Sequence, residues 1–78
     1  MMQMALSIAG SDPSGGAGLQ GDLKTFAAHG VFGQAVVSLL TVQNTLGVSE
    51  VHPVESGLVA RQLQVLLDDQ RPAGVKTG

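Results

Sequence analysis

A glycine-rich segment near the N-terminus contains the residues best suited to contact a ligand. Residues 10–18 read Gly-Ser-Asp-Pro-Ser-Gly-Gly-Ala-Gly and lie just before a pattern typical of a helix. Glycine lets the backbone approach a ligand closely, and the unpaired N–H groups at the start of a helix can bind an anion or a polar group. This composition predicts a loop that lines a site for a small polar molecule.

Two common nucleotide-binding motifs do not account for these glycines. Residues 16–21 match the GxGxxG pattern, in which the first glycine follows a strand closely and a carboxylate roughly 20 residues further on binds the ribose. Here the expected strand ends at Ala9, well before Gly16, and the first carboxylate after Asp22 is Glu50, in another element. No Gly-Lys-Ser/Thr follows, which excludes a Walker A loop. We therefore do not expect a dinucleotide site.

Polar residues also follow the other expected strands. Residues 43–45 read Gln-Asn-Thr after a long apolar run, and residues 76–78 read Lys-Thr-Gly. In open α/β sheets, ligands bind beyond the carboxyl ends of the strands. The side-chain amide of Gln43 can both donate and accept hydrogen bonds, which suits the edge of a heterocycle. The residues alone therefore predict a small-molecule pocket at these strand ends.

Several polar residues have simpler structural interpretations that stay open. Asp12 precedes Pro13, a position at which a carboxylate often closes an Asx turn. Asp22 is expected in the second turn of a helix, where it could merely favour the positive end of the helix dipole. His29 is expected in the last turn of that helix, where positive charge is favourable, and His52 is most simply a solvated side chain.

The elements that position these residues can be read from the apolar spacing. A short apolar run at residues 4–9 predicts a buried strand, and residues 31–42 predict a strand buried on both faces, as in a parallel sheet. Residues 48–53 predict a short edge strand, and residues 74–77 a final strand.

Two helices are expected between these strands. The first has Ser14 as its N-cap and Gly30 as the glycine that ends it, and the second has Ser56 as its N-cap. Their apolar faces comprise Leu19, Leu23, Phe26 and Ala27 in the first, and Val59, Leu63, Leu66 and Leu67 in the second. Strands alternating with helices predict an α/β fold with a parallel sheet. Two helices cannot cover both faces of such a sheet, so we expect a piece of a larger protein.

Composition excludes several classes of function. The 78 residues are 44% apolar with a net charge of −2, so we expect a soluble, cytoplasmic chain without a nucleic-acid or membrane partner. Cysteine is absent, which excludes disulfides and thiol chemistry. The two histidines are far apart in sequence, and we expect no metal site.

The glycine-rich segment also carries a family resemblance. Residues 9–25, Ala-Gly-Ser-Asp-Pro-Ser-Gly-Gly-Ala-Gly-Leu-Gln-Gly-Asp-Leu-Lys-Thr, closely resemble the N-terminal signature of the hydroxymethylpyrimidine and phosphomethylpyrimidine kinases of thiamine biosynthesis. Two later segments agree with it, Gln-Asn-Thr-Leu-Gly-Val at residues 43–48 and Val-Lys-Thr-Gly at residues 75–78. The resemblance implies a ribokinase-like fold of three layers, α/β/α, with residues 1–78 as the N-terminal part of a single kinase domain.

The resemblance further implies which residues bind the substrate. Gln43 matches the position that reads the ring nitrogen and amino group of the pyrimidine, Gly10 lines the pocket through its backbone, and Asp22 lies near the ring. ATP and Mg²⁺ are implied as cofactors. The catalytic residue and most ATP contacts are expected beyond this chain, so we expect no catalytic residue within it.

Three functional interpretations follow from the sequence. The leading one is a kinase that phosphorylates 4-amino-5-hydroxymethyl-2-methylpyrimidine and then its monophosphate with ATP. The alternatives are a pyridoxal or pyridoxine kinase of the same fold and a non-catalytic pyrimidine-binding module. A homodimer is left open.

Overall fold

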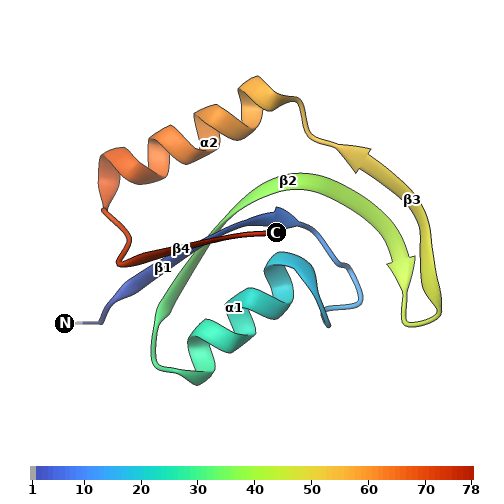
Figure 1. Ribbon diagram of the computed structural model, residues 1–78, viewed down its shortest axis with the longest axis horizontal. Helices are drawn as coiled ribbons and strands as arrows, with labels where there is room; N and C mark the ends of the chain where they lie inside the picture. The colour runs from blue at the N-terminus through green and yellow to red at the C-terminus, as the bar shows by residue number, and fades with distance from the viewer. Residues whose placement is uncertain (1) are drawn as a thin grey trace.

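The computed structural model describes residues 2–78, which form one four-stranded sheet with two helices. In Figure 1, α1 lies below the strands and α2 above them. The order along the chain is strand, helix, strand, strand, helix, strand, as predicted. The elements are β1 (Met4–Gly10), α1 (Gly18–Ala28), β2 (Phe32–Asn44), β3 (Gly47–Pro53), α2 (Ser56–Asp69) and β4 (Gly74–Thr77).

The sheet is mixed, which corrects the prediction of a parallel sheet. Its spatial order is β3-β2-β1-β4; β1 pairs in parallel with both β2 and β4, whereas β3 is antiparallel to β2. A tight turn at Thr45 and Leu46 joins β2 to β3, and a connection this short can only join antiparallel neighbours. The expected edge position of β3 is confirmed.

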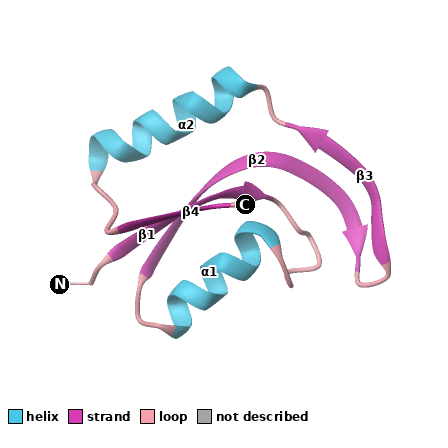
Figure 2. Cartoon of the chain, viewed as in Figure 1, coloured by secondary structure: helices cyan, strands magenta, loops and turns pink. Residues whose placement is uncertain are grey.

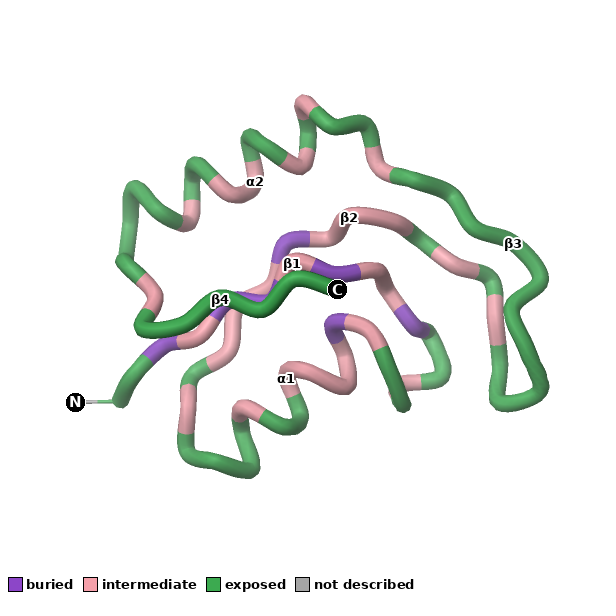
Figure 3. The backbone as a smooth tube through the Cα atoms, viewed as in Figure 1, coloured by how far each residue is buried: buried purple, intermediate pink, exposed green. Residues whose placement is uncertain are grey.

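The core lies along β1 and the middle of β2. Leu6 and Val36 are fully buried and sit on neighbouring parallel strands, with Met4, Ala9 and Leu19 also buried. Figure 3 shows this buried centre in purple and β3 in green along its whole length.

The expectation that β2 is buried on both faces holds only for its centre. Gly10, the last residue of β1, pairs with Leu39, so beyond Leu39 the strand β2 has only β3 as a neighbour. Leu40 and Val42 lie in this two-stranded part and are about half exposed. In Figure 2 this β2–β3 hairpin curves away from the rest of the sheet.

Both predicted N-caps are wrong. Helix α1 begins at Gly18, after Ala17, and no side chain caps it, because Ser14 lies in the preceding loop and bonds to Asp12 instead. Helix α2 is capped by Glu55, whose Oε1 accepts from the Gly57 N–H at 3.2 Å. Cap positions depend on backbone angles of single residues, which apolar spacing does not specify.

The predicted end of α1 is confirmed. Gly30 has a φ of 70°, the left-handed conformation typical of a glycine that ends a helix. His29 is the C-cap residue, and its Nδ1 lies 2.9 Å from the Thr25 carbonyl oxygen. A carbonyl oxygen only accepts, so Nδ1–H donates to it.

The side-chain amide of Gln62 hydrogen-bonds helix α2 to the sheet. Gln62 Nε2 donates to the Val37 carbonyl at 3.3 Å, and Gln62 Oε1 accepts from the Val37 N–H at 3.5 Å. Val37 precedes the stretch of β2 that pairs with β3, so these bonds satisfy backbone groups of β2 that β3 does not reach. Within residues 2–78, neither helix has the length and apolar character needed to cross a membrane.

Candidate functional site

The carboxylate of Asp12 organises the glycine-rich loop. It is 4% exposed and accepts four hydrogen bonds. Oδ1 accepts from the Ser14 N–H at 2.9 Å and the Ser14 hydroxyl at 2.6 Å, while Oδ2 accepts from the N–H groups of Gly16 at 3.1 Å and Ala17 at 2.8 Å. The Asx turn anticipated at Asp12 is thus present, within a larger network.

These bonds also decide the charge of the loop. The hydrogen bond from the Ser14 hydroxyl, followed by those from the backbone N–H groups, lowers the pKa of the Asp12 carboxyl, although burial opposes the shift. The charged carboxylate therefore occupies the amide groups just ahead of α1. The N–H groups of Gly16 and Ala17 are therefore bound within the chain and are not free to bind an external anion.

Glycine brings the helix start and the strand end into close contact. Gly18 has a φ of 59°, and a Cβ there would overlap the carbonyl oxygen of Gly10. A Cβ at Gly10 would lie 2.6 Å from Cδ1 of Leu39. Gln20 then ties the loop to α1, because its Oε1 accepts from the Asp12 N–H at 2.7 Å and its Nε2 donates to the Ser11 hydroxyl at 2.8 Å.

Asp22 links α1 to two strands. Its Oδ2 accepts from the Ser7 hydroxyl at 2.7 Å, and its Oδ1 lies 3.0 Å from Nζ of Lys76. The Ser7 hydrogen bond, and then the Lys76 ammonium, lower the pKa of the Asp22 carboxyl against the opposing effect of burial. Asp22 lies in the second turn of α1, as predicted, and its carboxylate contacts Ser7 and Lys76. Sequence reasoning missed Ser7, although a hydroxyl within a buried apolar strand is itself a signal.

Gln43 is connected to the glycine-rich loop through Thr41. Gln43 Nε2 donates to Thr41 Oγ1 at 2.6 Å, and Thr41 Oγ1 donates to the Ser11 carbonyl at 2.8 Å. Because Ser11 directly follows Gly10, the structure brings Gln43 and Gly10 to the same edge of the sheet. Asp22 lies further back, beside Ser7 in the middle of β1. Sequence reasoning missed Thr41 as well. The available signal was its position two residues before Gln43 on one strand, which places both side chains on the same face.

A β-bulge places Val48 opposite Gln43. Between Val42 and Gln43 the register shifts, so that Ser49 is an extra residue on β3, and its hydroxyl donates to the Val42 carbonyl at 2.9 Å. Val48 then lies opposite Gln43 and Val51 opposite Thr41. Paired residues share a face, so both valines flank the amide.

The surroundings of Gln43 suit a flat polar ring. Both valines are more than half exposed, and a depression of about 320 Å³ is lined by Gln43, Val48 and neighbouring residues of the hairpin. An amide between apolar side chains can bind a ring through its polar edge and its apolar faces.

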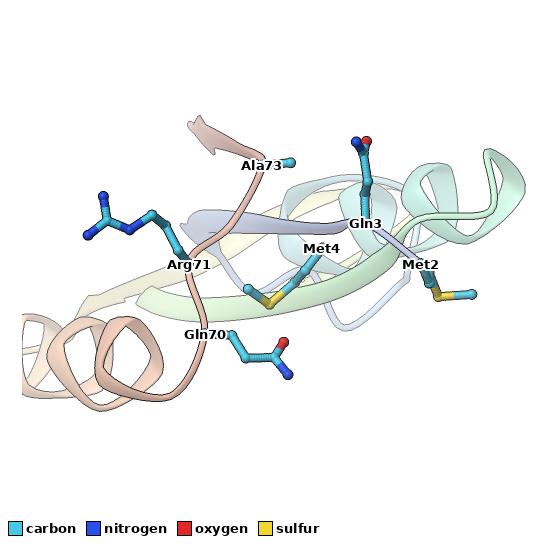
Figure 4. Close-up of a pocket in the computed structure, with 6 residues that line it drawn as sticks. All are labelled: Met2, Gln3, Met4, Gln70, Arg71 and Ala73. Carbon is cyan, nitrogen blue, oxygen red and sulfur yellow. The ribbon is translucent and has the colours of Figure 1, made fainter.

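A larger cavity lies elsewhere. It measures about 630 Å³ and is lined by Met2, Gln3, Met4, Gln70, Arg71 and Ala73 (Figure 4). These residues lie at the amino end of β1 and ahead of β4, opposite to the strand ends at which α/β sheets bind ligands. In Figure 4 the Arg71 side chain also extends away from Met4 and Gln3. We therefore do not assign the site to this cavity.

Residues 2–78 include histidine and carboxylate side chains, which are types that ligate metals. They contain no group of three or more histidine, aspartate or glutamate side chains placed to hold an ion. The side chain of His52 is exposed, and its Nε2 lies 3.0 Å from Glu50 Oε1. Asp12 and Asp22 are already bound by protein groups.

The chain is similar to known kinases along most of its length. The chain is 50% identical over 74 residues to the hydroxymethylpyrimidine/phosphomethylpyrimidine kinase of Bacillus subtilis, which is 95% of this chain and 27% of that relative. A crystal structure of phosphomethylpyrimidine kinase from Clostridium difficile superposes with a TM-score of 0.94 at 45% identity, over 97% of this chain and 33% of that one.

A related kinase shares the fold at lower identity. The pyridoxal kinase of Staphylococcus aureus, in complex with AMP-PCP and pyridoxal, gives a TM-score of 0.88 at 34% identity over 100% of this chain and 29% of that one. The expected ribokinase-like fold is thus confirmed for its N-terminal part. The chain spans between a quarter and a third of the length of each of these proteins.

A family model matches most of the chain. The model that describes phosphomethylpyrimidine kinase matches residues 12–78, from the Asp12 carboxylate through the Gln43 hairpin to the end of β4. From this match and the glycine-rich loop that it includes, we conclude that the chain belongs to the phosphomethylpyrimidine kinase family.

Proposed function

We propose that the complete gene product containing this chain is a hydroxymethylpyrimidine/phosphomethylpyrimidine kinase. It transfers the γ-phosphoryl group of ATP to the hydroxymethyl oxygen of 4-amino-5-hydroxymethyl-2-methylpyrimidine, and then phosphorylates the monophosphate to the diphosphate needed for thiamine biosynthesis. In the first transfer the hydroxymethyl oxygen bonds to the γ-phosphorus, the bond to the β-phosphate oxygen breaks, ADP leaves, and the hydroxyl loses its proton. Family membership and the B. subtilis relative support this reaction.

The contribution of this chain is to hold the pyrimidine. The observation that carries the proposal is the Gln43 amide, which donates to Thr41 at the carboxyl edge of the sheet and lies opposite Val48 of β3. Its Oε1 and its second N–H are available to the amino group and the ring nitrogen of the substrate. The Gly10 backbone forms the adjacent wall, and the negative charge of Asp22 lies behind it, near the ring.

The phosphate donor and its metal are assigned to the complete protein rather than to these residues. ATP is supported as donor by the related pyridoxal kinase, which was crystallised with AMP-PCP. Within residues 2–78, no cluster fits Mg²⁺, and the loop amides are bound to Asp12, so we derive no step through the metal.

A second candidate is phosphorylation of pyridoxal, because the S. aureus pyridoxal kinase shares this fold at 34% identity. Initial rates with ATP and Mg²⁺ on the hydroxymethylpyrimidine, its monophosphate and pyridoxal distinguish the two functions. The proposal expects the highest kcat/KM on the two pyrimidines. A higher kcat/KM on pyridoxal would replace the proposal, and binding of the pyrimidine without any transfer would indicate a non-catalytic module.

Substitution of Gln43 tests its role directly. Gln43→Leu leaves the polar edge of a buried ring unpaired, which costs about 1–3 kcal/mol, or a factor of roughly 5 to 150 in pyrimidine binding. We expect the pyrimidine KM to rise by that factor while the ATP KM changes little. Gln43→Glu should be milder, because a carboxylate still accepts from the amino group. A lowered thermal midpoint with an unchanged pyrimidine KM in Gln43→Leu would mean that Gln43 only stabilises the strand end.

A further inference from the structure

A short relay of hydrogen bonds determines which way the Gln43 amide faces. The hydroxyl of Thr41 lies 2.8 Å from the Ser11 carbonyl oxygen and 2.6 Å from the amide of Gln43. A carbonyl oxygen only accepts, so the single proton of the hydroxyl is donated to Ser11. The hydroxyl then has only lone pairs to offer Gln43, and the amide atom that faces it must be the NH₂ group. This orientation follows from the donor and acceptor inventory alone.

The far end of the relay is held firmly. The Ser11 N–H donates to the Leu39 carbonyl at 2.9 Å, and the Ser11 hydroxyl accepts from Gln20 Nε2 at 2.8 Å. The next residue, Asp12, is anchored by the four bonds to its carboxylate. The Ser11 carbonyl therefore cannot turn away to release the Thr41 proton without breaking the loop.

We propose that Thr41 is a positioning residue that locks the orientation of the Gln43 amide and so selects the ring edge that the site accepts. The identity of the ring rests on the proposed function. The locked amide presents one acceptor, Oε1, and one remaining N–H donor. It fits an edge on which an acceptor ring nitrogen adjoins a donor amino group.

Two ligands of the same shape, whose ring edges have donor and acceptor exchanged, distinguish selection of the ring edge from a simple fit of shape. The 4-amino pyrimidine offers the ring nitrogen as acceptor and the amino group as donor. Its 4-oxo analogue offers a ring N–H and a carbonyl oxygen, so a locked amide would face oxygen with oxygen and N–H with N–H. Without the Thr41 hydroxyl the Gln43 amide can flip, which exchanges its oxygen and its NH₂ group, and it can then satisfy either ring edge equally well.

The test is equilibrium binding of 4-amino-5-hydroxymethyl-2-methylpyrimidine and its 4-oxo analogue to the complete gene product, measured by calorimetry. We expect the unsubstituted protein to bind the amino compound about tenfold more tightly or better. In Thr41→Val the ratio should fall to within about threefold, while Thr41→Ser, which keeps the hydroxyl, should restore it. Thr41→Ala removes the same hydroxyl should the valine variant fail to fold.

A matched control is available on α1. The Thr25 hydroxyl also donates to a backbone carbonyl, that of Gly21 at 3.1 Å, but takes no part in the relay. Thr25→Val should leave the binding ratio unchanged. An unaltered ratio in both Thr41→Val and Thr41→Ala would overturn the inference while leaving the proposed function intact. Binding of neither compound by the unsubstituted protein would overturn the proposed function, and the assigned ring edge with it.

Discussion

The close contact between the start of α1 and the end of β1 can be tested with one methyl group. Gly18→Ala adds a Cβ that would overlap the Gly10 carbonyl oxygen, and it does so at a residue with a φ of 59°. Gly30→Ala is the matched control, because Gly30 has a φ of 70° but no atom within 4 Å of the added Cβ. The difference between the two variants therefore isolates the contact from the conformational cost of positive φ.

The magnitude follows from these two terms. An L-residue in the left-handed conformation costs about 1–2 kcal/mol, which both variants incur. Overpacking against a backbone atom adds about 1–3 kcal/mol, because neither the strand end nor the helix start can move without shifting the other. We expect Gly30→Ala to cost about 1–2 kcal/mol and Gly18→Ala about 2–5 kcal/mol.

The assay compares thermal midpoints and pyrimidine KM values of both variants in the complete gene product. Gly18→Ala should lower the midpoint further than Gly30→Ala, and it alone should raise the pyrimidine KM, because it displaces Gly10 from the pocket edge. Equal midpoints for the two variants would refute the reasoning, since the overlap with Gly10 would then have no energetic consequence.

Two further predictions concern acidity and the chain in isolation. The pKa values of Asp12 and Asp22 are lowered in the folded protein from 3.8, so their stabilising effect is complete above that pH and is lost as the pH falls through the folded values. Asp22→Asn should therefore lower the thermal midpoint at about pH 7 and lower it by far less at about pH 2. The control Asp69→Asn, at the exposed end of α2, should have little effect on the midpoint at either pH. An equal loss of thermal midpoint in Asp22→Asn at both pH values would contradict this account. The purified 78-residue chain should not phosphorylate the hydroxymethylpyrimidine, because it spans 27% of the B. subtilis relative and its loop amides are bound to Asp12; transfer above a mock preparation would show the prediction to be wrong.

Local sequence patterns predicted the elements and one part of the site correctly. The order of strands and helices, the glycine that ends α1, the edge position of β3 and the Asx turn at Asp12 each depend on residues close together in the chain. The N-cap predictions were wrong even though caps depend on nearby residues. Ser14 bonds to Asp12 instead of capping α1, and Glu55 caps α2 in place of Ser56. The roles of Gln43, Gly10 and Asp22 toward a substrate stay predictions.

Residues that can approach a ligand are recognisable from their types alone, because glycine freedom and amide chemistry belong to single residues. The partners of these residues depend on how the chain folds. The Thr41 hydroxyl meets the Ser11 carbonyl across 30 residues, and Lys76 meets Asp22 across 54. These pairs form because parallel strands bring distant segments side by side, and no local pattern records that register. The orientation of the Gln43 amide depends on one such contact, between Thr41 and Ser11. This orientation is therefore a property of the fold and not of the local sequence motif.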